Sequence, residues 1–131
     1  MGSYTIKNLK QDVEDSAPKF GMSEVLEARF AREELGLEVS GVSYQRLEPE
    51  ARLPFGHNHK EQEELYVVTA GSGRIKLDDD ILELKQWDAI RIPAGTMRSV
   101  EAGSDGLEIV AFGAPSNGNA DVEMVQGWWS D

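Results

Sequence analysis

Residues 56–71 decide the fold, and they read Gly-His-Asn-His-Lys-Glu-Gln-Glu-Glu-Leu-Tyr-Val-Val-Thr-Ala-Gly. They contain both histidines of the chain, His57 and His59, with one residue between them. On an extended segment the side chains at i and i+2 point to the same side, so the two imidazoles can converge on one point. Glu64 follows five positions later, at the start of an apolar run typical of a strand. Two imidazoles and one carboxylate form the facial ligand set that non-haem iron and related transition metals use.

A second stretch, residues 87–98, reads Trp-Asp-Ala-Ile-Arg-Ile-Pro-Ala-Gly-Thr-Met-Arg. The two stretches resemble, in the right order, the two motifs of the cupin superfamily, H-x-H-x(3,4)-E-x(6)-G and G-x(5)-P-x-G-x(2)-H. The resemblance covers roughly residues 37–113 and implies an all-β fold, a small single-domain double-stranded β-helix or jelly-roll barrel. Two positions depart from the second motif. Trp87 stands in place of its leading glycine, and Arg98 stands where the family has a fourth metal-ligating histidine.

Arg98 leaves two arrangements open, because a guanidinium is not a metal ligand and stays charged in proteins. A unit positive charge about 4 Å from a divalent ion costs roughly 8 kcal/mol at an effective dielectric constant near 20, so Arg98 cannot point straight at a bound metal. In the arrangement that we favour, Arg98 swings to the barrel mouth and leaves three protein ligands with open positions for water and substrate. In the other, Arg98 points inward, replaces the metal, pairs with Glu64 and offers its planar fork to an anion.

The resemblance implies a divalent transition metal (Fe, Mn, Ni, Cu, Co or Zn) held by His57, His59 and Glu64, with Arg98 deciding whether the metal is retained. It further implies a dioxygenase-like, isomerase or decarboxylase reaction on a small molecule. The candidate substrate-binding residues are Arg98 and Tyr66, whereas the motifs identify no catalytic residue and no substrate.

Two other classes of function stay open. One is a metal-free cupin that binds a small anion or sugar and acts as a sensor or carrier, with Arg98 in the pocket. The other is an assembly role, in which the barrel mainly forms a homodimer through its N-terminal arm and the apolar pair Trp128 and Trp129. We expect a homodimer under any of these functions, and we expect the tryptophans to pack on the barrel or across the dimer interface.

The rest of the chain fits a single domain, as expected for 131 residues. Residues 1–22 are predicted to form an N-terminal arm, and residues 23–131 the barrel with its C-terminal tail. The segment 23–36 suits a helix and a strand equally well, and the tail from residue 115 is expected to be a loop before the two tryptophans. Turn residues separate the expected strands, which cover residues 37–47, 64–69, 74–77, 81–84, 89–92, 98–101 and 107–112.

Composition excludes several classes of protein. The formal charge of −11 disfavours binding to nucleic acid or to an anionic membrane surface. The absence of cysteine removes disulfides, zinc–thiolate sites and iron–sulfur clusters. No apolar stretch is long enough to span a bilayer, and the N-terminus lacks the basic and apolar regions of a secretory signal, which predicts a cytoplasmic protein.

Overall fold

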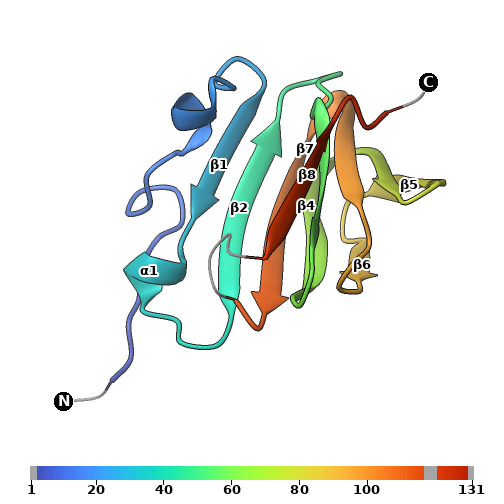
Figure 1. The fold of residues 1–131 in the computed structure, drawn as a ribbon. Coiled ribbons are helices and arrows are strands. Elements are labelled where there is room, and N and C mark those ends of the chain that lie inside the picture. The colour runs from blue at the N-terminus through green and yellow to red at the C-terminus, as the bar shows by residue number, and fades with distance from the viewer. Residues whose placement is uncertain (1–2, 117–120, 130–131) are drawn as a thin grey trace.

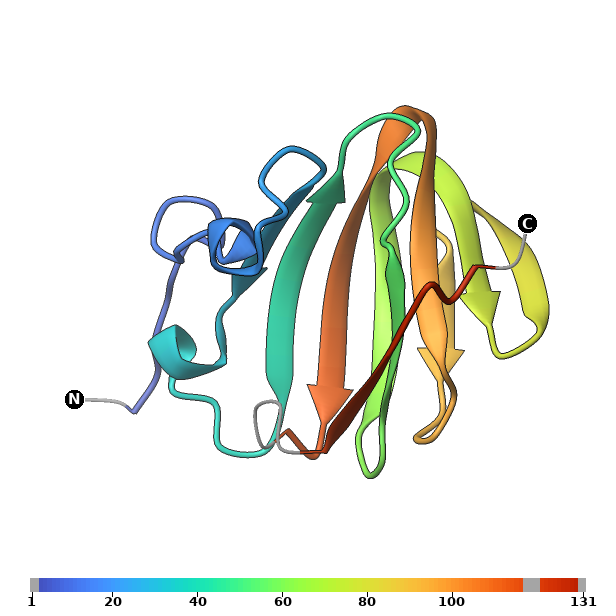
Figure 2. The ribbon, with the colours of Figure 1, turned by 45° about the horizontal axis from the view of Figure 1, so that its top comes forward.

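The computed structural model describes residues 3–116 and 121–129. The described residues form eight strands, which are joined into one antiparallel sheet curled into a half-barrel (Figure 1, Figure 2). The strands are β1 (Leu26–Phe30), β2 (Gly41–Leu47), β3 (Phe55–His59), β4 (Glu63–Leu77), β5 (Asp80–Lys85), β6 (Ala89–Ile92), β7 (Arg98–Ala114) and β8 (Val122–Gln126). A 3-10 helix, η1 (Ala17–Phe20), and one helical turn, α1 (Arg32–Leu35), flank β1. The all-β fold with one curled antiparallel sheet expected from the sequence is confirmed.

The long strand β7 organises the sheet. Its second half pairs with β2 and with the first half of β4, and its first half pairs with the second half of β4. At its first residue, Arg98, β7 also pairs with His57 of β3. Residues directly opposite each other in an antiparallel pair have their side chains on the same face. The topology therefore places Arg98 beside His57 on one face of the sheet.

The glycine-rich segments that the sequence analysis interpreted as turns between strands lie inside strands. Residues 64–69 and 74–77 belong to the single strand β4, and residues 98–101 and 107–112 belong to β7. Register shifts near Gly71 bend the pair β4–β7, as bulges do. At Gly71 the backbone adopts φ +76° and a Cβ atom would collide with the carbonyl oxygen of Gly106. These glycines permit a close approach between two long strands, so the predicted turns were wrong.

The remaining predicted elements agree with the structure only in part. Segment 23–36 contains both elements considered, since β1 precedes the helical turn α1. The expected strands over 81–84 and 89–92 correspond to β5 and β6, whereas the expected strand over 37–47 was too long, because β2 begins at Gly41. The tail prediction missed β8, which pairs with β3, and residues 117–120 of the expected loop lie outside the described residues.

The core lies between the curled strands and extends under the N-terminal residues. Val13 and Ala17 are buried, and Asp15 bridges to Arg29 of the edge strand β1. At the other end of the chain, Trp129 packs on the barrel and its indole N–H contacts the carbonyl oxygen of Leu53 at 3.1 Å. None of the helices in the described ranges has the length and hydropathy needed to cross a membrane.

Candidate metal centre

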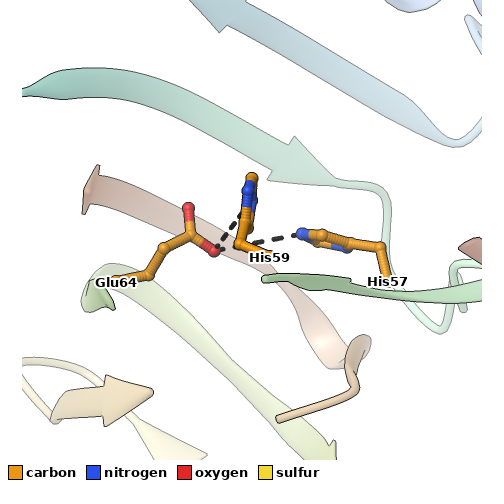
Figure 3. Close-up of side chains that lie close together, drawn as sticks. All are labelled: His57, His59 and Glu64. Atoms are coloured by element: carbon orange, nitrogen blue, oxygen red, sulfur yellow. Dashed lines mark ion pairs between the residues drawn. The ribbon is translucent and has the colours of Figure 1, made fainter. Parts of the chain in front are cut away.

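The three predicted ligands come together at the junction of β3 and β4. His57 and His59 lie on β3, and Glu64 is the second residue of β4, which begins after a connection of only three residues. Glu64 Oε1 is 3.9 Å from His57 Nε2 and 3.6 Å from His59 Nε2 (Figure 3). One ligand atom from each residue lies within 4.8 Å of the other two. The convergence expected from the H-x-H spacing is therefore present.

The two distances from Glu64 to the imidazoles are close to those expected around a bound transition metal. Metal–nitrogen and metal–oxygen bonds of about 2.1 Å place two ligand atoms about 3.0 Å apart at a right angle and about 3.4 Å apart at the tetrahedral angle. The distances from Glu64 Oε1 to the two imidazole nitrogens exceed these values by a few tenths of an ångström in the tetrahedral case. The donor set of two imidazoles and one carboxylate accepts several divalent metals.

The protonation states also suit a metal. Burial, with help from the nearby positive charge of Arg98, lowers the pKa of His57 to about 3, so its imidazole is neutral at physiological pH. A neutral imidazole is the form that binds metal. Burial raises the pKa of Glu64, and the charge of Arg98 only partly opposes this shift. A bound cation would favour the ionised carboxylate.

Arg98 does not occupy the barrel mouth, contrary to the arrangement favoured from the sequence. Its side chain is fully buried, and Nη2 lies 3.6 Å from Glu64 Oε1. The reason is the pairing of Arg98 with His57, which directs both side chains to the same face. The distance is longer than the roughly 2.7–2.9 Å of a charge-assisted hydrogen bond. Nε, Nη1 and Nη2 have no hydrogen-bond partner among the described residues.

A cavity of about 1130 Å³ opens beside the ligands. Glu64 and Tyr66 line it, and the Tyr66 hydroxyl lies 3.5 Å from Glu64 Oε1. Burial and the charge of Glu64 raise the pKa of Tyr66, so the phenol keeps its proton. Apolar side chains that also line it belong to Met22, Leu26, Ala28, Phe30, Leu53 and Met124, and charged ones to Glu14, Lys19, Arg32, Glu33 and Glu34. Arg98, predicted to bind substrate, is not among the residues that line this cavity.

The sequence analysis missed one residue of the site, Asp121, which directly precedes β8. Its Oδ1 lies 2.9 Å from His59 Nδ1, and its Oδ2 accepts hydrogen bonds from the backbone amides of Glu61 (3.1 Å) and Gln62 (3.2 Å). Burial alone would raise the pKa of Asp121, but these hydrogen bonds lower it below its usual value. No local pattern marks Asp121, because the strand pairing β3–β8 brings it to His59 from a distant part of the chain.

Comparisons with known proteins show the fold. An uncharacterised protein of Methanocaldococcus jannaschii is 32% identical in an alignment of 83 residues, which spans 59% of this chain and 66% of that protein, just under two thirds of its length. A cupin protein from Bacteroides fragilis is 26% identical with a TM-score of 0.71, over 89% of this chain and 88% of that one.

Oxalate decarboxylase from Bacillus subtilis has a TM-score of 0.74 at 22% identity, over 93% of this chain and 32% of that one. At that identity the likeness concerns the fold alone. No family model matches the chain. One fold can host many reactions, so the reaction has to be argued from the site.

Proposed function

The chain has the fold of the cupin superfamily, and on that premise we propose that it is a metal-dependent enzyme acting on a small anionic substrate. The observation that carries the proposal is the convergence of His57, His59 and Glu64 on one point beside a cavity. Three protein ligands leave open coordination positions, as catalytic metal sites require. A divalent metal at this point would polarise an oxygen atom of the substrate or bind dioxygen.

The charges around the site favour an anion. His57 is neutral, and Glu64 supplies one negative charge, whereas Arg98 adds a permanent positive charge 3.6 Å from that carboxylate. A divalent cation in the site would leave a positive excess, which a carboxylate or enolate oxygen of the substrate would offset. Tyr66 keeps its hydroxyl proton beside Glu64 and can donate it to such an oxygen.

The size and lining of the cavity restrict the substrate further. Its volume of about 1130 Å³ accommodates a small organic molecule with room for water. Its lining mixes apolar side chains with charged ones, among them Lys19, Arg32 and Glu64. The proposed reaction belongs to the dioxygenase-like, isomerase or decarboxylase classes, in which the metal and Tyr66 act on an oxygen of the substrate.

A metal-free cupin that binds an anion is the second candidate, and the position of Arg98 favours it. The guanidinium is buried 3.6 Å from Glu64, and its three nitrogen atoms lack hydrogen-bond partners among the described residues, so it adds a positive charge that attracts an anion to the neighbouring cavity. Under this alternative, Arg98 neutralises Glu64 in place of a metal and the protein acts as a sensor or carrier. The homodimer and the cytoplasmic location expected from the sequence stay predictions.

Thermal unfolding of the chelator-treated protein separates the two candidates. We expect the melting temperature to rise when Zn²⁺ or Mn²⁺ is added to the wild-type protein, since a ligand at about 100 times its dissociation constant stabilises the folded state by about 2.7 kcal/mol. The double variant His57→Ala/His59→Ala should lose this rise, and Asn58→Ala, between the two histidines, should keep it. A melting temperature that ignores metals and chelator but rises with oxalate would favour the metal-free candidate.

A further inference from the structure

Asp121 is not one of the three candidate ligands, but its carboxylate contacts the imidazole of His59, which is. It is buried, and both of its carboxylate oxygens are engaged. Oδ1 faces His59 Nδ1 at 2.9 Å, and Oδ2 accepts hydrogen bonds from the backbone amides of Glu61 and Gln62 in the β3–β4 connection. The amides hold the carboxylate in place, so the position of Oδ1 against the imidazole does not depend on His59 itself.

This geometry selects one form of the His59 ring. A carboxylate oxygen accepts hydrogen bonds, so His59 Nδ1 must carry the proton and donate it. In the neutral ring, which is the form that binds metal, the other nitrogen, Nε2, then presents its lone pair toward Glu64 Oε1, 3.6 Å away. Two acceptor atoms that face each other at this distance are brought into a favourable arrangement by a cation between them.

We infer that Asp121 is a positioning residue that holds His59 in its Nδ1–H tautomer and so directs the Nε2 lone pair to the metal position. The inference rests on the proposed metal site, but the tautomer itself is a property of the metal-free protein. Carboxylates that hydrogen-bond a metal-ligating histidine fix its tautomer and its orientation, and their loss typically weakens metal affinity 10–100-fold.

Two variants separate this role from a purely structural one, in which Asp121 only stabilises the β3–β4 connection (the loop) through its hydrogen bonds to Glu61 and Gln62. In Asp121→Asn, the backbone amides of Glu61 and Gln62 hold the side-chain oxygen at the former Oδ2 position. The amide NH₂ group then faces His59 Nδ1 and can only donate to it. Nδ1 becomes the acceptor, and the proton moves to Nε2, where it blocks the ligand lone pair. Asp121→Ala removes all three hydrogen bonds and leaves His59 free to adopt either tautomer.

The two roles predict opposite orders of the variants. If Asp121 sets the tautomer, Zn²⁺ affinity falls from wild type to Asp121→Ala and further to Asp121→Asn, although Asp121→Asn keeps more hydrogen bonds and melts at the higher temperature of the two. If Asp121 only supports the loop, Zn²⁺ affinity follows thermal stability, and Asp121→Ala is the weaker binder.

The test combines Zn²⁺ titration calorimetry with long-range ¹H–¹⁵N correlation spectra of the metal-free proteins at pH 8. We expect His59 to be Nδ1–H in the wild type and Nε2–H in Asp121→Asn, with Zn²⁺ affinity at least tenfold below that of wild type. His57 is an internal control, because no hydrogen bond to its Nδ1 is found among the described residues, and its tautomer should be the same in both proteins.

Either of two results would overturn the inference: His59 remaining Nδ1–H in Asp121→Asn, or Zn²⁺ affinity following thermal stability. If the wild-type protein binds no Zn²⁺, the proposed function fails. The spectra then still decide whether Asp121 sets the tautomer, so the two failures are distinguishable.

Discussion

Replacing Arg98 with methionine should increase the affinity of the site for a divalent metal. A cation bound about 2.1 Å from Glu64 Oε1, on the side of the histidines, would lie about 5 Å from Arg98 Nη2. At an effective dielectric constant near 20, the repulsion between a divalent ion and the guanidinium amounts to about 7 kcal/mol. Spreading of the guanidinium charge and rearrangement of the site reduce this value, and we expect a gain of at least tenfold in affinity, about 1.4 kcal/mol.

Titration of metal-free protein with Zn²⁺, in competition with a coloured chelator, measures this effect. The experiment is best done at pH 8, because loss of Arg98 removes a charge that lowers the pKa of Glu64. Lys85→Met is the matched control, since Lys85 is a largely exposed residue of β5 whose cation pairs with Asp88. An unchanged or weaker Zn²⁺ affinity in Arg98→Met, with the control equal to wild type, would refute the electrostatic reasoning.

Three further predictions concern stability. The pKa of His57 is about 3 in the folded protein, against 6.5 for an unperturbed histidine. The unfolded chain therefore binds a proton that the folded protein does not, and metal-free protein should lose stability as the pH falls from about 6.5 toward 3. In a pH series of thermal unfolding, His57→Gln should lose less stability over this range than the wild type. Trp87 is exposed and adopts φ 73°, a backbone conformation that costs a non-glycine residue roughly 1–2 kcal/mol. Trp87→Gly should therefore raise the melting temperature, and a lower melting temperature would contradict the role of backbone strain. Trp129→Phe removes the indole N–H that contacts Leu53 and Ser99. Chemical denaturation should show that the free energy of unfolding falls by about 1–3 kcal/mol. An unchanged free energy of unfolding would mean that the tail does not stabilise the barrel.

The convergence of the three candidate ligands could be predicted from the sequence because it depends on local geometry. The H-x-H pair lies on one short extended segment, where alternate side chains share a face. Glu64 follows after a short connection, at a strand position that faces the same way. Neither relation requires knowledge of a distant part of the chain, and the resemblance of this stretch to the first cupin motif is what identified the three residues as candidate ligands.

Arg98 and Asp121 illustrate what the sequence could not supply. The direction of Arg98 follows from its pairing with His57 across the β3–β7 contact, and Asp121 reaches His59 only because β8 pairs with β3. Both pairings join segments far apart in the chain, so local patterns do not encode them. The glycines of β4 and β7 misled the strand prediction for a related reason, since Gly71 serves the close approach to Gly106 and not a chain reversal.

Metal content tests the central claim most directly. Untagged protein, purified without added metal, is analysed by inductively coupled plasma mass spectrometry beside the double variant His57→Ala/His59→Ala. The proposed site predicts about one transition-metal ion per wild-type chain and a loss of that ion in the variant. Wild-type protein that contains no metal and takes up none on titration would contradict it, and would mean that Arg98 occupies the place of the ion.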